Sequence, residues 1–199
     1  MPFQFFADAA LTTPLTNAHT QTRTDGSSIR NNIAIWFGST DEAKKVVAAS
    51  NPGVDPVTVT PVSLLTTRAN STAYTVGKLL IPATPNNRVY EVTASSGAGL
   101  SGASPPTYPT TVGDTVADGD LTLTCIAYQD EVGEYKLAGT LAGLDSATPG
   151  AGISLGAEVL GGVSNAVVFY VRCTDADLVT QDQTLQLALD TNDLNEDAA

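Results

Sequence analysis

Three tyrosines in the middle of the chain have the chemistry of a binding surface. Tyr74, Tyr90 and Tyr108 each combine a flat apolar ring with a polar hydroxyl, which suits contacts with sugars and with proteins alike. Tyr108 lies in a proline-rich turn and is the strongest candidate for an exposed contact. The three residues are therefore the candidate ligand-binding set, and packing in a small core is the alternative for Tyr74 and Tyr90.

The residue types that enzymes use for catalysis form no recognisable constellation. His19 is the only histidine, and it lies in a stretch rich in Thr, Gln and Asn without the orienting partner that a catalytic histidine needs. The acidic residues are scattered and lack the spacing of paired catalytic carboxylates. The sequence predicts a protein that is not an enzyme, with no catalytic residues and no cofactor.

Two groups of aspartates could offer oxygen ligands to calcium. Asp175 with Asp177 is one group, and Asp114 with Asp118 and Asp120 is the other. Neither group has the regular ligand spacing of a calcium-binding loop. We therefore predict solvated loop carboxylates and no metal site.

Cys125 and Cys173 lack the spacing of zinc ligands or of a redox pair. Each lies in a strand-like run, and no secretory signal is visible at the N-terminus. Two free buried thiols are therefore expected, and a disulfide between them is the alternative.

A glycine-rich stretch at residues 97–102 (GAGLSG) superficially resembles a phosphate-binding loop. It lacks the following helix and the terminal GK[ST] that such a loop needs to hold a phosphate group. Clusters of Gly and Ser between strands are usually turns, so the sequence predicts a flexible hairpin loop here.

The net charge of −12 is unevenly distributed. Residues 68–128 hold three basic and four acidic residues, which leaves −11 for the rest of the chain. Residues 175–199 contain seven acids and no Lys or Arg, which predicts a solvated face, with steering toward a basic partner as the alternative. Such a surface repels phosphate backbones, so no nucleic-acid partner is expected.

The composition and the residue pattern predict an all-β protein. Charged residues make up 15% of the 199 residues, and no apolar run approaches the roughly 18 residues of a membrane helix, so no membrane partner is expected. Strand-like runs recur about every 8–12 residues with turn signals between them, which is typical of a β-sandwich. The expected strands are 3–6, 32–37, 57–60, 78–81, 89–93, 120–125, 135–142, 153–155, 158–160, 166–173 and 184–189.

The central segment, residues 68–128, differs in pattern from the segments that flank it. Its short strand-like runs alternate with stretches rich in Pro and Gly. We predict a small β module at 68–128, inserted into a discontinuous host domain formed by residues 1–67 and 129–199.

Several short, turn-rich stretches of the flanking segments resemble sequences of a known protein family. The stretches 25–28 (DGSS), 35–40 (IWFGST), 44–45 (KK) and 49–55 (ASNPGVD) resemble the N-terminal part of virion structural proteins of tailed bacteriophages. The stretch 142–156 (AGLDSATPGAGISLG) resembles the second half of the same family. This resemblance implies an immunoglobulin-like β-sandwich interrupted by an insertion.

The central segment has a resemblance of its own. The stretches 72–78 (TAYTVGK), 88–92 (RVYEV), 105–109 (PPTYP) and 118–125 (DGDLTLTC) are similar to small β modules of phage head and tail proteins, which in turn look like chitin-type carbohydrate-binding domains. Sugar-binding members usually expose tryptophans, whereas the corresponding positions here hold Tyr108 and Leu123.

Together the resemblances imply a capsid decoration or cement protein on the virion surface. The implied partners are the major capsid protein and further copies of the chain, with a cell-surface glycan as an additional partner of the module. One alternative is a tail or baseplate adhesin whose module binds a host saccharide. The other is a cell-surface carbohydrate-binding protein unrelated to virions.

Overall fold

The computed structural model describes residues 2–15, 32–129, 132–173 and 187–199. This part of the chain is all-β and is built from several mostly antiparallel sheets, as the sequence predicted. No helix in it is long and apolar enough to cross a membrane. Its helical turns are three short 3-10 segments, η1 (Val132–Glu134), η2 (Ala142–Asp145) and η3 (Val163–Asn165).

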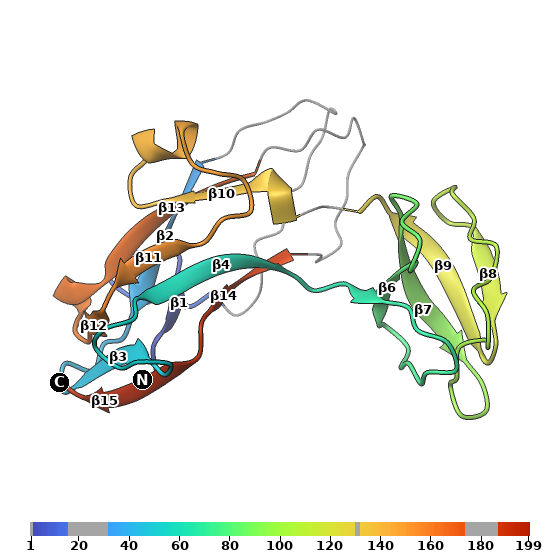
Figure 1. Cartoon of the computed structure of the whole chain (residues 1–199), viewed down its shortest axis with the longest axis horizontal. Helices are drawn as coiled ribbons and strands as arrows, with labels where there is room; N and C mark the ends of the chain where they lie inside the picture. Colours follow the sequence, from blue (N-terminus) through green and yellow to red (C-terminus); the bar gives the residue numbers. More distant parts are fainter. Residues whose placement is uncertain (1, 16–31, 130–131, 174–186) are drawn as a thin grey trace.

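The first layer of the flanking segments is a four-stranded antiparallel sheet (Figure 1). Its strands, in spatial order, are β1 (Gln4–Phe6), β2 (Asn32–Gly38), β13 (Val167–Cys173) and β10 (Tyr135–Ala138). β2 and β13 form the central pair, and their β-branched and aromatic residues favour extended backbone. Their register places Phe169 opposite Ile35, so these two buried side chains lie on the same face.

The second layer consists of two three-stranded antiparallel sheets that run end to end. One has the order β11 (Ile153–Gly156), β4 (Val57–Ser63) and β14 (Leu187–Thr191). The other has the order β12 (Glu158–Leu160), β3 (Lys44–Ala48) and β15 (Leu194–Ala198). β11 leads directly into β12, and β14 into β15, so the two sheets share their outer chain segments.

Asn192 holds the junction between these two sheets. Its side-chain oxygen accepts a hydrogen bond from the Thr58 N–H at 2.9 Å, and its amide donates to the Pro56 carbonyl at 3.1 Å. The carbonyl of the next residue, Asp193, accepts from the Ala49 N–H at 2.8 Å. These bonds pair backbone groups that the change of strand would otherwise leave without partners.

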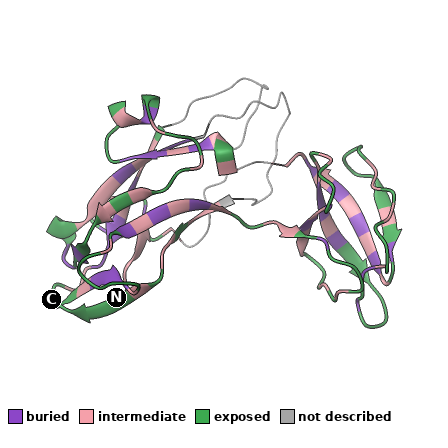
Figure 2. Cartoon of the chain, in the orientation of Figure 1, coloured by how far each residue is buried: buried purple, intermediate pink, exposed green. Residues whose placement is uncertain are grey.

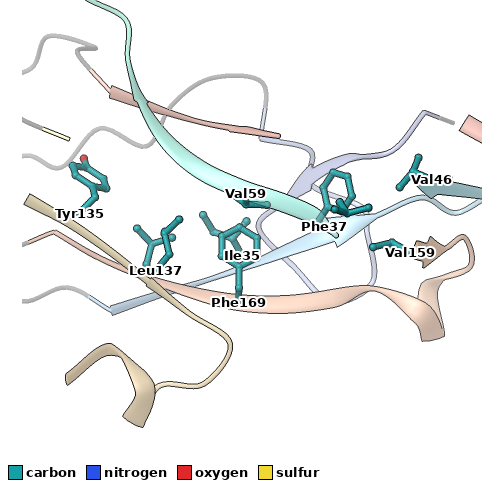
Figure 3. Close-up of a cluster of buried hydrophobic side chains, with 10 residues drawn as sticks. Ile35, Phe37, Val46, Val59, Tyr135, Leu137, Val159 and Phe169 are labelled. Atoms are coloured by element: carbon teal, nitrogen blue, oxygen red, sulfur yellow. The ribbon is translucent and has the colours of Figure 1, made fainter. Parts of the chain in front are cut away.

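The two layers form a β-sandwich around one cluster of buried apolar side chains (Figure 3). Strand alternation points these side chains inward from both layers, because successive residues of a strand face opposite sides. The buried members are Ile35, Phe37, Val46, Val57, Val59, Tyr135, Leu137, Val159, Phe169 and Val171.

The central segment, together with the two residues before it, forms a separate five-stranded sheet, which lies beside the sandwich in Figure 1. Its spatial order is β5 (Thr66–Thr67), β6 (Leu79–Ile81), β7 (Val89–Ser95), β9 (Leu121–Ala127) and β8 (Thr115–Asp118). The pair β5–β6 is parallel and the other pairs are antiparallel. Figure 2 shows the alternation of buried and partly exposed residues along β9.

This sheet has its own apolar cluster, distinct from the cluster of the sandwich. The buried members are Leu80, Tyr90, Val92, Leu121, Leu123 and Cys125. Cys125 is a free, buried thiol and so is not in a disulfide, and burial raises its pKa. Cys173 ends β13, and its side chain lies outside the described residues.

Two expected elements differ from the strands observed. The predicted strand 135–142 ends at Ala138, because the chain turns there into η2, where the Gly143 N–H donates to the Thr140 carbonyl at 3.1 Å. The acidic C-terminal residues include β15, a strand that was not predicted and that pairs with β3; its acidic side chains are exposed, as expected for a solvated face. The predicted strand 184–189 lies partly outside the described residues, and β14 begins at Leu187.

Replacing Phe169 by alanine should destabilise the sandwich by about 3–5 kcal/mol, because a fully buried ring leaves a cavity. Urea unfolding followed by the fluorescence of Trp36 measures this, since the only tryptophan lies in β2. The control is Val54→Ala, at a side chain that is 70% exposed, which should change stability by less than about 0.5 kcal/mol. Equal effects of the two substitutions would contradict the assignment of this core.

Candidate functional site

A buried ion pair joins the first residue of the central segment to the turn between its last two strands. Arg68 follows β5 directly, and Asp118 ends β8. The Arg68 Nη2 lies 2.8 Å from Asp118 Oδ1, and Nε lies 3.0 Å from Oδ2, so the pair is bidentate. Both side chains are 1% exposed. The hydrogen bond to Asp118 raises the pKa of Arg68, and both charges are compensated by each other.

Arg68 also binds two neighbouring loops, the long connection between β7 and β8 and the connection between β5 and β6. Nη2 also donates to the carbonyls of Gly102 at 2.6 Å and Ser104 at 3.1 Å, while Nη1 donates to the side chain of Asn70. In return the Gly102 N–H donates to Asp118 Oδ1 at 2.9 Å. The ion pair therefore fixes a loop as well as two strands.

Asp120 fixes the glycine-rich part of the same loop. Its Oδ2 accepts hydrogen bonds from the Ala98 and Leu100 N–H groups, each at 3.2 Å. Gly119 has a φ of +67°, and a Cβ there would lie 2.5 Å from the Leu100 carbonyl oxygen. The prediction of a flexible hairpin loop was wrong: residues 97–102 belong to a long connection that is held by carboxylates about twenty residues further along the chain.

Tyr90 was wrongly placed among the candidate surface residues, because its side chain is fully buried. Its ring lies in the apolar cluster of the central sheet. Its hydroxyl donates to the Pro109 carbonyl at 2.7 Å and accepts from the Asn86 amide at the same distance. These contacts support the packing alternative, and burial raises the pKa of Tyr90.

Tyr108 packs directly on Tyr90, with ring centroids 4.8 Å apart and the rings tilted by 46°. Its ring is partly exposed, but its hydroxyl is buried and has no hydrogen-bond partner among the described residues. Burial raises the pKa of this hydroxyl, and the nearby positive charge of Arg68 partly offsets the effect. Tyr108 thus presents part of its ring, and not its polar tip, to solvent.

Tyr74 is also partly buried and packs against the same cluster. Its hydroxyl accepts a hydrogen bond from the Ala69 N–H at 2.8 Å. The structure therefore brings Tyr74, Tyr90 and Tyr108 together, but as one packed group that covers one face of the central sheet. Two of the three hydroxyls are used inside the protein.

The opposite face of the central sheet is rich in threonine. On β9, Thr122 and Thr124 alternate with buried residues and so lie on this face. Thr115 of β8 is the cross-strand partner of Thr124, and the Thr93 hydroxyl lies 2.8 Å from the Thr124 hydroxyl. The sequence analysis did not single out this face, although the alternation of residues 121–125 (LTLTC) predicts it.

The other candidate residues have structural roles or lie outside the described part of the chain. Asp118 and Asp120 are committed to Arg68 and to backbone amides, as described above. No group of three or more His, Cys, Asp or Glu side chains suited to a metal ion occurs within the described ranges. His19, Asp175 and Asp177 are not among the residues described.

Comparison with known proteins gives no match to a protein family, to a curated protein or to a solved structure. Function is therefore inferred from the chain's own architecture and chemistry.

Replacing Arg68 by methionine should destabilise the central sheet by about 3–5 kcal/mol, because Asp118 would remain buried without its partner. Hydrogen exchange of the β9 amides measures the loss. Lys45→Met is the matched control, followed at the β3 amides: its ion pair with Glu158 at 3.0 Å is partly exposed, so the cost should be at most about 1 kcal/mol. If Arg68→Met lowers the free energy of unfolding no more than Lys45→Met does, the buried ion pair is dispensable.

The central sheet should lose stability at alkaline pH. The pKa values of Tyr90 and Tyr108 are raised above their ordinary value of 10.0, so the folded state holds these protons more tightly than the unfolded chain does. Their contribution is complete below about pH 10 and is lost as the pH rises through the raised values. Urea unfolding followed by near-ultraviolet circular dichroism should show this decline, and Tyr108→Phe should reduce it. A Tyr108→Phe protein with an unchanged profile would contradict the assignment.

Proposed function

We propose that the chain is a non-enzymatic structural protein of a tailed-phage virion, and that it decorates or cements the capsid. The observation that carries the proposal is the division of the strands between two separate apolar clusters. The chain leaves the sandwich after Ser63, builds the central sheet, and re-enters the sandwich at β10 (Figure 1). An element connected in this way can be displayed without disturbing the fold that carries it.

In this proposal the sandwich is an immunoglobulin-like host formed by residues 1–67 and 129–199, and residues 68–128 are an inserted module. The separate clusters and the separate sheets support the division, and β5 (Thr66–Thr67) extends the sheet of the module two residues beyond the predicted boundary. The resemblance of both flanking segments to one virion protein family supports the same division, because the two halves of that family then form one sandwich.

The host would bind the outer surface of the capsid and face the major capsid protein. Its charge of −11 favours a basic partner surface through long-range attraction. Its edge strands include β1, β10 and β14, which can bury backbone and apolar surface against a neighbour. Binding that requires the assembled shell stabilises the shell by mass action.

The second candidate is a tail or baseplate adhesin whose module binds a cell-surface glycan. The specific feature in its favour is the threonine face, which offers hydroxyl groups on a flat sheet. Against it stands the packing of the three tyrosines, since only part of the Tyr108 ring is free to stack on a sugar.

Quantitative mass spectrometry of purified particles separates the two candidates. A decoration protein should match the copy number of capsid subunits or capsomers, because it binds a repeated lattice site. Particles that lack the protein should also release their DNA at a lower temperature, and addition of the purified chain should restore the original value.

A glycan array with the same protein provides the opposite test. The decoration proposal expects no strong, specific binding, and so no effect of Tyr108→Ala. A few copies per particle together with tight glycan binding that Tyr108→Ala abolishes would establish the adhesin instead.

A further inference from the structure

The strand β8 is an open edge of the central sheet. It is the last strand in the sheet order and the outermost strand in Figure 1, and β9 is its one strand neighbour within the described residues. Cys125 directs both of its backbone groups toward the residues that precede β8: its N–H donates to the Asp114 carbonyl at 2.9 Å, and its carbonyl accepts from the Gly113 N–H at 2.7 Å. Because inward and outward positions alternate along antiparallel strands, Val116 and Asp118 direct their backbone groups toward β9, and Thr115 and Ala117 direct theirs outward.

At its outward positions this edge lacks the charged and proline residues by which proteins prevent unwanted strand pairing, although it is only four residues long. The outward positions Thr115 and Ala117 are exposed and uncharged, and β8 contains no proline. The outer strand β15 of the sandwich, in contrast, contains Glu196 and Asp197. Charged residues on an edge oppose pairing, so the β15 edge is protected in a way that the β8 edge is not.

We propose that β8 pairs antiparallel with β8 of a second copy of the chain about a two-fold axis. With Val116 opposite its own copy, Thr115 lies opposite Ala117 of the second copy, and the reverse pair follows by symmetry. Both pairs are then hydrogen-bonded pairs, so all four outward N–H groups and all four outward carbonyls of the two strands find partners. Two five-stranded sheets become one continuous sheet.

The distribution of charge favours a second copy as the occupant. The central segment carries a net charge of only −1, whereas the rest of the chain carries −11. A two-fold axis at β8 joins the nearly neutral parts and leaves the acidic sandwiches outside the contact. In this register Asp114 lies opposite Asp118 of the second copy, whose charge is compensated by Arg68.

The β8–β8 contact is small, so it is weak between molecules that diffuse freely. It becomes populated when two copies are held close together. A strand of four residues gives few hydrogen bonds to offset the lost freedom of two molecules. Neighbouring copies on a capsid lattice have a high effective concentration, and there the same contact would link them. This role rests on the proposed function, whereas the pairing itself is testable in solution.

Cross-linking in solution tests both the pairing and its register. Thr115→Cys and Ala117→Cys proteins, distinguished by a size tag, are mixed under mild oxidation. Paired residues at hydrogen-bonded positions have Cα atoms about 5.5 Å apart, which a disulfide can span. The mixed disulfide should form about tenfold faster than the disulfide of either variant alone, because the pairing holds only the mixed pair at bonding distance.

The two variants are matched, since both positions are exposed and both side chains lie on the face opposite Cys125. Equal rates in the mixture and in the single variants would overturn the proposal. The unmodified protein gives a second readout: hydrogen exchange of the Thr115 and Ala117 amides should slow as protein concentration rises, while that of Val116 stays constant. Exchange independent of concentration at all three amides would overturn it as well. Failure of either test leaves the capsid location open, because particle copy number is measured separately.

Discussion

The central sheet depends on one buried ion pair, between Arg68 and Asp118. Arg68 follows β5, the first strand of this sheet, and Asp118 ends β8, the strand at the opposite edge. Burying two charges is costly unless they pair and their remaining hydrogen-bonding groups are satisfied. Here the carbonyls of Gly102 and Ser104 and the N–H of Gly102 complete the set. The same ion pair therefore connects the residue after β5 to the end of β8, and it holds the connection between β7 and β8 in place.

The fixed orientation of β8 connects the fold to the proposed assembly. A carboxylate at the end of β8 is buried and neutralised, so the edge itself can remain uncharged. The chain's excess of acid is instead carried by the sandwich, where it opposes pairing of the outer strand β15 and favours a basic partner. One polypeptide thus combines a strongly acidic part with a nearly neutral part, and the proposal assigns the first to the capsid lattice and the second to further copies of the chain.

Much of the fold is predictable from local pattern, because strict alternation specifies a strand with one buried face. Residues 121–125 (LTLTC) became β9 with Leu121, Leu123 and Cys125 buried, as alternation requires. β15 was not predicted, since its sequence is mostly acidic and polar and it forms only through pairing with β3 and the ion pair between Lys44 and Glu196.

The site was predicted less well, because its organisation is not local. The glycine-rich loop carries no signal that Asp118 and Asp120 hold it, and those contacts appear only once the sheet has formed. Tyr90 precedes Glu91 and Val92 in an alternating run, so its position on the face of Val92 indicated burial. The chemistry of the tyrosine side chain alone does not distinguish a buried ring from an exposed one.

Cryo-electron microscopy of the intact virion tests the central claim most directly. The account predicts one copy at each equivalent lattice position, with the sandwich on the shell and the central sheet projecting outward. Density for this chain at the tail or baseplate alone would contradict it.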